Sequence, residues 1–279
     1  MGEVDVGGGF RELLQAAWRR SGSMLCVGLD PDPARFPSSL DGSRDAIFRF
    51  CREIVDATAD LVCAFKPQIA YFAAQGAERQ LEQLCTYIRE LHPGVVLLLD
   101  AKRGDIGPTA EQYAREAFHR YGAHAVTASP YLGTDTLEPF LRHRGHGVFV
   151  LCRTSNPGSG DFQSLLIDGE PLFAHVARRA QLEWSEIGEV GLVVGATYPS
   201  ELALVRSICP DLPILVPGVG AQGGDIEAIM EVGADAAGEG MLVNSSRAVL
   251  YASAGADFAE AARIVAMQTR DELRIHQRR

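Results

Sequence analysis

The chain has 279 residues, of which 47% are apolar and 22% are charged, and its formal net charge is −10 at pH 7. This composition is typical of a globular protein rather than a disordered one, and an acidic chain lacks the clustered Lys and Arg that nucleic-acid binding requires. Because no stretch reaches 18 consecutive apolar residues and the first ten residues include no apolar core, we expect neither a membrane-spanning helix nor a secretion signal.

Short apolar runs alternate with amphipathic stretches along the whole chain. The first predicted element is a helix over about residues 9–20. Eight strand-like runs follow, and they begin at Met24, Leu61, Val95, His124, Gly147, Gly191, Pro213 and Ala234. Helices are predicted where apolar residues recur at i, i+3 and i+4, over residues 43–60, 77–91, 109–121, 172–188, 200–208 and about 257–274.

The strand-like runs are continuously apolar, which is typical of parallel strands that are covered by helices on both faces. Eight such strands alternating with helices over roughly 250 residues predict a (β/α)8 barrel, here with an extra N-terminal helix. An open, doubly wound sheet has the same local pattern, so the choice depends on the count of eight. No proline-rich linker divides the chain, and residues 1–279 are expected to form a single barrel domain.

The six cysteines never form a C-x-x-C pair, and most of them lie within apolar runs. We therefore expect buried, reduced thiols rather than disulfides or zinc ligands, and a cytoplasmic protein. The seven histidines also lack the spacing of a metal site, so no metal is expected.

Charged residues follow the first three predicted strands: Asp30, then Lys66, then Asp100, Lys102 and Asp105. In a parallel barrel the C-terminal ends of all strands meet at one face, where active sites lie. Asp100 and Lys102 are two residues apart, so a regular strand directs both side chains to the same side. The sequence predicts a cluster of alternating charge suited to proton transfer. The alternative is an ion-pair network that only closes the barrel, but burying several charges in this way is costly.

Two loops after the seventh and eighth predicted strands have features of a phosphate site. Residues 217–225 (PGVGAQGGD) contain four glycines, which let backbone N–H groups approach an anion, and Arg247 begins the next helical turn. Barrel enzymes often bind phosphate between these loops, although a tight turn and a surface cation would give the same residues. Gly218, Gly220 and Gly223 match the dinucleotide fingerprint, but they follow the wrong strand and lack its acidic partner, so no dinucleotide is expected.

The segment DAKRGDIGPT (residues 100–109) closely resembles the orotidine 5′-phosphate decarboxylase family, in particular its longer bacterial subgroup, and the resemblance covers nearly the whole chain. Six further segments match the family in the same order, namely VGLDPDP, FKPQIAYF, TASPYLG, TSNPGS, VPGVGAQGGD and NSSRAVLYA. The resemblance implies a (β/α)8 barrel that converts orotidine 5′-phosphate to UMP in pyrimidine biosynthesis, without a metal or cofactor. It also implies a homodimer with active sites at the subunit interface.

The resemblance implies a role for each matching residue. Lys66, Asp100 and Lys102 would form a charged array with an Asp105 that the partner subunit supplies, and Lys102 would be the proton donor. The residues expected to contact the nucleotide are Asp30 and Thr109 near the ribose and phosphate, Ser155 at the pyrimidine edge, and Gln222 and Arg247 at the phosphate.

Two positions do not fit this pattern. Pro108 stands where relatives commonly have a small polar residue, and its ring biases Gly107 toward extended geometry, which can shift the loop that carries Asp105 and Thr109. Glu239 is predicted to lie inside the eighth strand, where it has no assigned partner.

Two other functions compete with decarboxylation of a nucleotide. A related barrel with the same array can act on a sugar phosphate, as a decarboxylase or an aldolase, usually with a metal; two lysines in the cluster disfavour a divalent cation. A nucleotide-binding regulator that has lost catalysis is the second alternative. Binding alone would not require so costly a cluster of charges, which argues against it.

Overall fold

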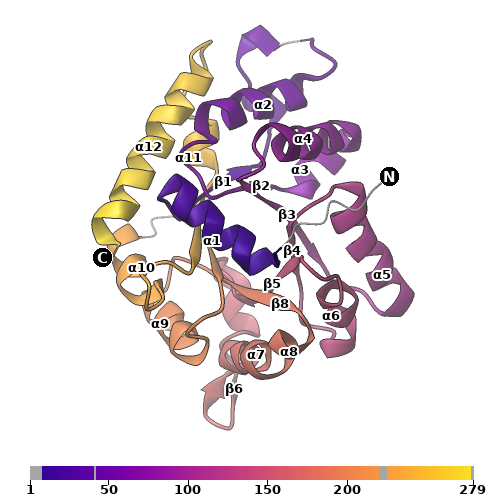
Figure 1. Cartoon of the computed structure of the whole chain (residues 1–279), viewed down its shortest axis with the longest axis vertical. Helices are drawn as coiled ribbons and strands as arrows, with labels where there is room; N and C mark the ends of the chain where they lie inside the picture. Colours follow the sequence, from indigo (N-terminus) through magenta and orange to yellow (C-terminus); the bar gives the residue numbers. More distant parts are fainter. Residues whose placement is uncertain (1–7, 41, 220–224, 278–279) are drawn as a thin grey trace.

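The computed structural model describes residues 8–40, 42–219 and 225–277, which form a closed barrel of eight parallel strands (Figure 1). The predicted (β/α)8 barrel is therefore confirmed. β10 pairs with β1, and β8 follows β5 around the barrel because β6 and β7 form a separate hairpin. The strands of the barrel are β1 (Leu25–Leu29), β2 (Ala64–Pro67), β3 (Val96–Arg103), β4 (Ala125–Ala128), β5 (Gly147–Arg153), β8 (Glu189–Val194), β9 (Ile214–Pro217) and β10 (Met241–Ser245).

Helices cover the outside of the barrel, as Figure 1 shows. In α2 the residues at the predicted spacing, Ile47, Phe50, Cys51, Ile54 and Val55, are all buried in the core, which is why this segment is helical. The helices that surround the strands are α2 (Ala46–Thr58), α3 (Ile69–Ala73), α4 (Glu78–Leu91), α5 (Gly107–Arg115), α6 (Thr134–Leu141), α7 (Leu172–Arg179), α8 (Ser185–Ile187), α9 (Pro199–Ile208), α10 (Ile226–Gly233), α11 (Arg247–Leu250) and α12 (Phe258–His276).

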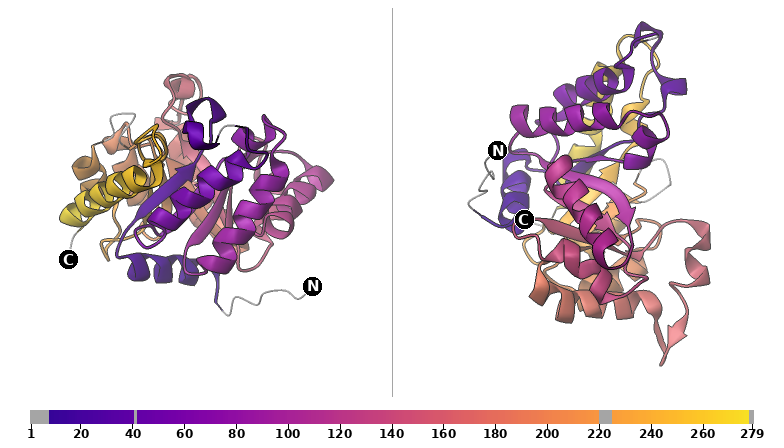
Figure 2. Two further views of the ribbon diagram at one scale, coloured as in Figure 1. Left: turned by 90° about the horizontal axis from the view of Figure 1, so that it is seen from above. Right: turned by 90° about the vertical axis from the view of Figure 1, so that its right-hand side faces the viewer.

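The extra N-terminal helix α1 (Phe10–Ser21) closes the end of the barrel where the strands begin, opposite the strand arrowheads in the left view of Figure 2. The Phe10 ring packs edge-on against Phe149 of β5, and Trp18 Nε1 donates a hydrogen bond of 2.9 Å to the carbonyl of Met241. Glu189 accepts from the backbone N–H of Phe10 at 2.8 Å, so a carboxylate stabilises the N-terminus of α1. The helix does not cover the opposite end of the barrel, where the strands finish.

The eighth strand begins later than predicted, at Met241 rather than Ala234. The preceding residues form a turn in which the Asp235 carboxylate accepts hydrogen bonds of 2.9 Å from the N–H groups of Ala237 and Glu239. An Asp side chain that bonds its own loop competes with strand pairing. Glu239 therefore lies outside the strand, and the prediction that placed it inside was wrong.

Several helical details also differ from the predictions. The helix predicted over residues 109–121 begins at Gly107 and becomes π-helical over Glu116–Arg120, and a second π-helical segment, Ala180–Trp184, separates α7 from α8. The predicted helices do not include α6, which contains Pro139, a residue that usually ends helices. A hairpin of β6 (Leu166–Ile167) and β7 (Glu170–Pro171) extends outward between β5 and α7 in the right view of Figure 2.

All six cysteines are buried and unpaired, which confirms the expectation of reduced thiols. Burial raises the pKa of Cys209 to about 11 and that of Cys26 to about 12, so these thiols stay protonated at neutral pH. Within the described ranges, none of the helices has the length and apolar character that crossing a bilayer requires.

Candidate active site

The C-terminal ends of β2 and β3 bring three charged side chains into contact. Lys66 Nζ donates to Asp100 Oδ2 at 2.9 Å, and Lys102 Nζ donates to Asp100 Oδ1 at 2.7 Å. Asp100 pairs with Gln68 beyond the end of β2, so parallel register places the two strand ends side by side. The structure thus brings Lys66, Asp100 and Lys102 together at the strand ends, as the sequence predicts.

The reason for this proximity differs from the predicted one. β3 is not regular after Leu99: its register against β4 shifts between Leu99 and Arg103, and Lys102 adopts a left-handed conformation with φ 48°. For a residue with a side chain this conformation is unfavourable and persists only where its surroundings hold it. A bulge, rather than strand alternation, directs Lys102 to Asp100.

Thr127 of β4 holds this bulge in place, and sequence reasoning missed it. Its Oγ1 accepts hydrogen bonds of 2.9 Å from the N–H groups of Ala101 and Lys102, and donates one of 2.9 Å to Asp100 Oδ1. The hydroxyl therefore uses its one proton and both lone pairs. The available signal was a hydroxyl residue within an otherwise apolar buried strand.

Burial and charge oppose each other in the cluster, and charge prevails. Asp100 and Lys66 are only 6% and 4% exposed. Burial alone would raise the pKa of Asp100, but the ammonium groups of Lys66 and Lys102 hold it well below its ordinary value. Burial would lower the pKa of Lys66, yet chiefly Asp100 and also Asp30 keep it above its ordinary value. Asp100 is therefore a carboxylate and Lys66 an ammonium at neutral pH.

Lys66 and Lys102 are also the only two lysines in the sequence; the other 24 of its 26 basic residues are arginines. An ammonium on a flexible stem can give up a proton, whereas a guanidinium cannot do so in a protein. The chain therefore has amine side chains only in this cluster. Counting lysines would have singled out the pair from the sequence alone.

The two other predicted acids, Asp30 and Asp105, do not complete the cluster. Asp30 follows β1, and its Oδ1 is buried without a hydrogen-bond partner among the described residues. Asp105, in the loop after β3, accepts a hydrogen bond of 2.8 Å from the N–H of Ile106 and forms no ion pair within the described part of the chain. One copy of the chain thus supplies two cations, Lys66 and Lys102, and one acid, Asp100, that is hydrogen-bonded to both.

Thr109 lies exposed in the first turn of α5. The expected extended geometry of Gly107 was wrong, since its φ is +48°, a left-handed value that glycine adopts at little cost. Pro108 then occupies the first turn of the helix, where its missing N–H breaks no hydrogen bond.

The predicted phosphate residues are partly described. Gln222 lies outside the described residues. β9 and β10 are paired, with Pro217 opposite Asn244, so the loops that follow them start side by side. Arg247 is exposed at the start of α11, just beyond β10, and makes no ion pair with the described residues. The structure therefore places an exposed cation just beyond β10, the strand that pairs with β9 ahead of the predicted loop.

Ser155 follows β5 and is tightly packed against the chain that leaves β8. A Cβ at Gly195 would lie 2.8 Å from Ser155 Cβ and 3.0 Å from Ser155 N. Glycine is thus needed for this approach. The contact fixes the position of the Ser155 backbone at the mouth of the barrel.

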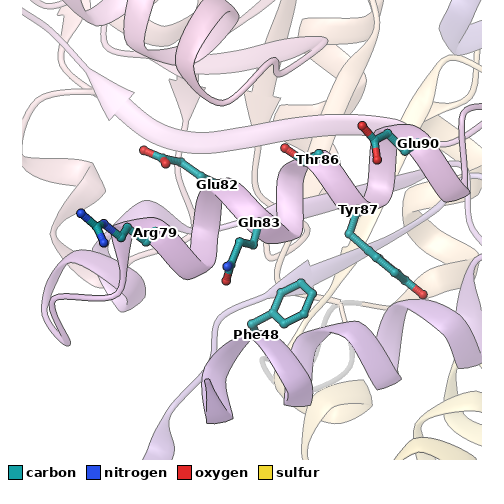
Figure 3. Close-up of a pocket in the computed structure, with 7 residues that line it drawn as sticks. All are labelled: Phe48, Arg79, Glu82, Gln83, Thr86, Tyr87 and Glu90. Carbon is teal, nitrogen blue, oxygen red and sulfur yellow. The ribbon is translucent and has the colours of Figure 1, made fainter. Parts of the chain in front are cut away.

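A hollow of about 590 Å3 lies elsewhere, on the flank of the barrel between α2 and α4 (Figure 3). Phe48 and Tyr87 face each other in it at 6.1 Å, and Tyr87 Oη donates to Asp56 at 2.7 Å. Arg79 and Glu90 project away from this contact in Figure 3. Its polar groups do not converge on a common point, and we assign it no chemistry.

A metal is not favoured by the donor set at the cluster. Within the described ranges, no three His, Cys, Asp or Glu side chains are grouped so that they could hold an ion. Both oxygens of Asp100 already accept from ammonium groups, whose charges repel a divalent cation.

Comparisons of the sequence and of the structure with known proteins agree on one family. The model of the "Orotidine 5′-phosphate decarboxylase / HUMPS family" matches residues 23–263. The orotidine 5′-phosphate decarboxylase of Ralstonia pickettii is 64% identical over 264 residues, which cover 95% of this chain and 97% of that protein, and that of Cupriavidus metallidurans is 63% identical with the same coverage. The structure of Leishmania donovani OMP decarboxylase is 40% identical, with a TM-score of 0.82, and the match covers 96% of this chain and 99% of that one.

Proposed function

The chain belongs to the orotidine 5′-phosphate decarboxylase / HUMPS family and is a carboxy-lyase, and on this premise we propose that it converts orotidine 5′-phosphate to UMP without a cofactor, as one catalytic domain over residues 1–279. The observation that carries the proposal is the Lys102 ammonium, held 2.7 Å from Asp100 at the strand ends. The names of the relatives favour this substrate over a sugar phosphate.

The reaction needs a fixed cation. When the bond between C6 and the carboxylate breaks, CO2 leaves and the electron pair stays on C6, in an orbital that the pyrimidine ring does not delocalise. A preorganised charge in a site shielded from water stabilises such an anion strongly. In our proposal Lys102 lies beside C6, stabilises the developing charge and then donates a proton to C6. Solvent afterwards returns a proton to the amine.

Asp100 and Lys66 support this step by positioning and charge. Asp100 accepts a hydrogen bond of 2.7 Å from Lys102 and so holds the amine in place. Lys66 binds the second oxygen of Asp100 at 2.9 Å and fixes the carboxylate. Thr127 holds the backbone of Lys102, so the donor is oriented before substrate binds.

The proposal includes a homodimer with shared active sites. Asp105 does not reach the cluster of its own chain, which a second copy would explain. Exposed apolar side chains beyond the neighbouring strands β3 and β4 support such an interface: Ile106 is 62% exposed, and Tyr131 and Leu132 are 79% and 46% exposed. Large exposed apolar side chains that lie together are typical of protein interfaces.

Ultraviolet absorbance tests the proposed function directly. Incubation of orotidine 5′-phosphate with the pure protein is expected to change the absorbance spectrum to that of UMP, at the same rate with and without a chelator. No spectral change, together with turnover of a sugar phosphate that the chelator abolishes, would instead support a metal-dependent aldolase or decarboxylase. Binding of the nucleotide with no turnover of either substrate would support the regulator.

Arg247→Ala is expected to weaken UMP binding by about ten- to a hundredfold, because a hydrogen bond to a charged phosphate contributes about 1.5–3 kcal/mol. Calorimetry with UMP and with uridine measures this effect; uridine lacks the phosphate, so its affinity should not change. Arg179→Ala is the matched control, since Arg179 is also exposed but pairs with Glu183 on the flank of the barrel. Unchanged UMP affinity in Arg247→Ala would remove this residue from the phosphate site.

A further inference from the structure

Arg153, the last residue of β5, is a buried cation at the mouth of the barrel that the reaction above does not use. Its side chain is 6% exposed, and the register of β5 against β8 shifts just before it, between Leu151 and Arg153. A buried charge is costly unless it is paired and hydrogen-bonded. The partners of Arg153 therefore indicate what the charge contributes.

Arg153 joins two elements that approach the site separately. Its Nε donates to Glu201 Oε2 of α9 at 2.7 Å, and its guanidinium lies 4.8 Å from the centre of the Tyr198 ring, in the segment that leads from β8 into α9. On the other side, its Nη1 donates to the carbonyl of Thr154 at 3.2 Å and to the hydroxyl of Ser159. The guanidinium thus fastens the loop after β5 to α9.

The same loop is closed at its far end by Gln163. Its Oε1 accepts from the N–H of Thr154 at 2.8 Å and from Arg153 Nη1 at 3.4 Å, while its Nε2 donates to Thr154 Oγ1 at 3.0 Å. Thr154 Oγ1 in turn donates to Asn156 Oδ1 at 2.6 Å. Ser155 is therefore flanked by two residues that belong to one network centred on Arg153.

We propose that Arg153 is a positioning residue for base recognition: it holds the loop over residues 154–163 so that Ser155 is placed for the pyrimidine edge of the nucleotide. The inference rests on the proposed function, because it assumes that Ser155 contacts the base. Arg153 does not touch the ligand. Without the Arg153 side chain, the loop adopts the arrangement that binds the base for only a fraction of the time. The affinity for the base then falls in proportion to that fraction.

A second buried arginine shows what a purely structural role looks like. Arg206 of α9 is 8% exposed, and among the described residues its guanidinium donates only to backbone carbonyls, including those of Gly233 at 2.8 Å, Leu212 at 2.8 Å and Gly240 at 3.0 Å. Leu212 and Gly240 precede β9 and β10, so this network lies at the closed end of the barrel. Arg206 therefore offers a matched control of similar burial that is remote from Ser155.

The experiment compares ligands with and without the base. In Arg153→Met and Glu201→Gln, UMP is expected to bind about tenfold more weakly, the loss that corresponds to about one hydrogen bond to a charged group. Ribose 5-phosphate, which lacks the base, should keep its affinity within about twofold. Arg206→Met should lower the melting temperature without changing the ratio of the two affinities. Glu201→Gln keeps the size of the side chain and serves if Arg153→Met does not fold.

Each outcome of these binding measurements either supports or overturns the role proposed for Arg153. A selective loss of UMP affinity in the Arg153 and Glu201 variants, absent in Arg206→Met, supports the inference. Equal weakening of both ligands, no weakening of either, or the same selective loss in Arg206→Met overturns it. Wild-type protein that neither binds UMP nor changes orotidine 5′-phosphate would instead refute the proposed function, so the two failures are distinguishable.

Discussion

Replacing Lys102 by alanine is expected to lower turnover of orotidine 5′-phosphate by at least about 10⁴-fold, because the change removes both the fixed cation and the proton donor. This factor corresponds to about 5.5 kcal/mol of lost transition-state stabilisation. Affinity for UMP should remain measurable, since the proposed phosphate and base contacts lie on other strands. Single-turnover absorbance measures the rate, and calorimetry with UMP measures binding.

Chemical rescue separates the ammonium from other effects of this substitution. In Lys102→Cys, alkylation of the thiol with 2-bromoethylamine displaces bromide and leaves an ammonium on a stem of nearly the original length. The six native cysteines are buried and unpaired, so the reagent should react at position 102. Recovery of a substantial part of the activity is expected. Near-normal turnover of Lys102→Ala, or no recovery after alkylation, would contradict the role assigned to Lys102.

Mixing two inactive variants is expected to restore activity if the sites are shared. In a heterodimer of Lys102→Ala and Asp105→Ala, one site carries both substitutions and the other carries neither. Random exchange at equal concentrations makes half of the dimers mixed, so about a quarter of the wild-type activity should return. Two different affinity tags verify the exchange, and absorbance measures the activity.

The control for this mixing uses two residues of the same half-site. Lys102→Ala mixed with Asp100→Asn leaves every site with one defect, since the structure places both residues in one chain's cluster. No activity should return in that mixture. If the Lys102 and Asp105 variants also fail to complement each other after verified exchange, then Asp105 acts within its own chain or not at all, and the proposed dimeric site is wrong.

The barrel was predictable because its signals are local. Each buried strand is a continuous apolar run, and the count of eight distinguishes a barrel from an open sheet. What failed depended on particular side chains: Asp235 bonds its own loop and delays the last strand, and Pro139 lies within a helix. Neither effect is visible in periodicity, because one hydrogen bond or one residue decides it.

The candidate site was predictable only at the level of strand ends. Parallel topology alone brings Lys66 next to Asp100, so their contact could be expected. The bulge at Lys102 could not, because it depends on the hydroxyl of Thr127, which lies 25 residues further along the chain. A regular strand would also have placed Lys102 beside Asp100, but through the alternation of side chains rather than through a bulge. The role proposed for Asp105 depends on a second copy of the chain, which one sequence does not describe.

Confining its two lysines to one cluster gives this protein an unusual susceptibility to amine-directed reagents. Apart from the N-terminal amine, an acylating dye, an aldehyde fixative or a carboxyl-activated sensor surface has two targets. Only the Lys102 side chain is accessible, since it is 46% exposed whereas the Lys66 side chain is 5% exposed. Immobilisation by such chemistry would therefore block the mouth of the barrel. Conversely, lysine labelled with nitrogen-15 would yield two ammonium resonances, both from the cluster, and would report on it without background.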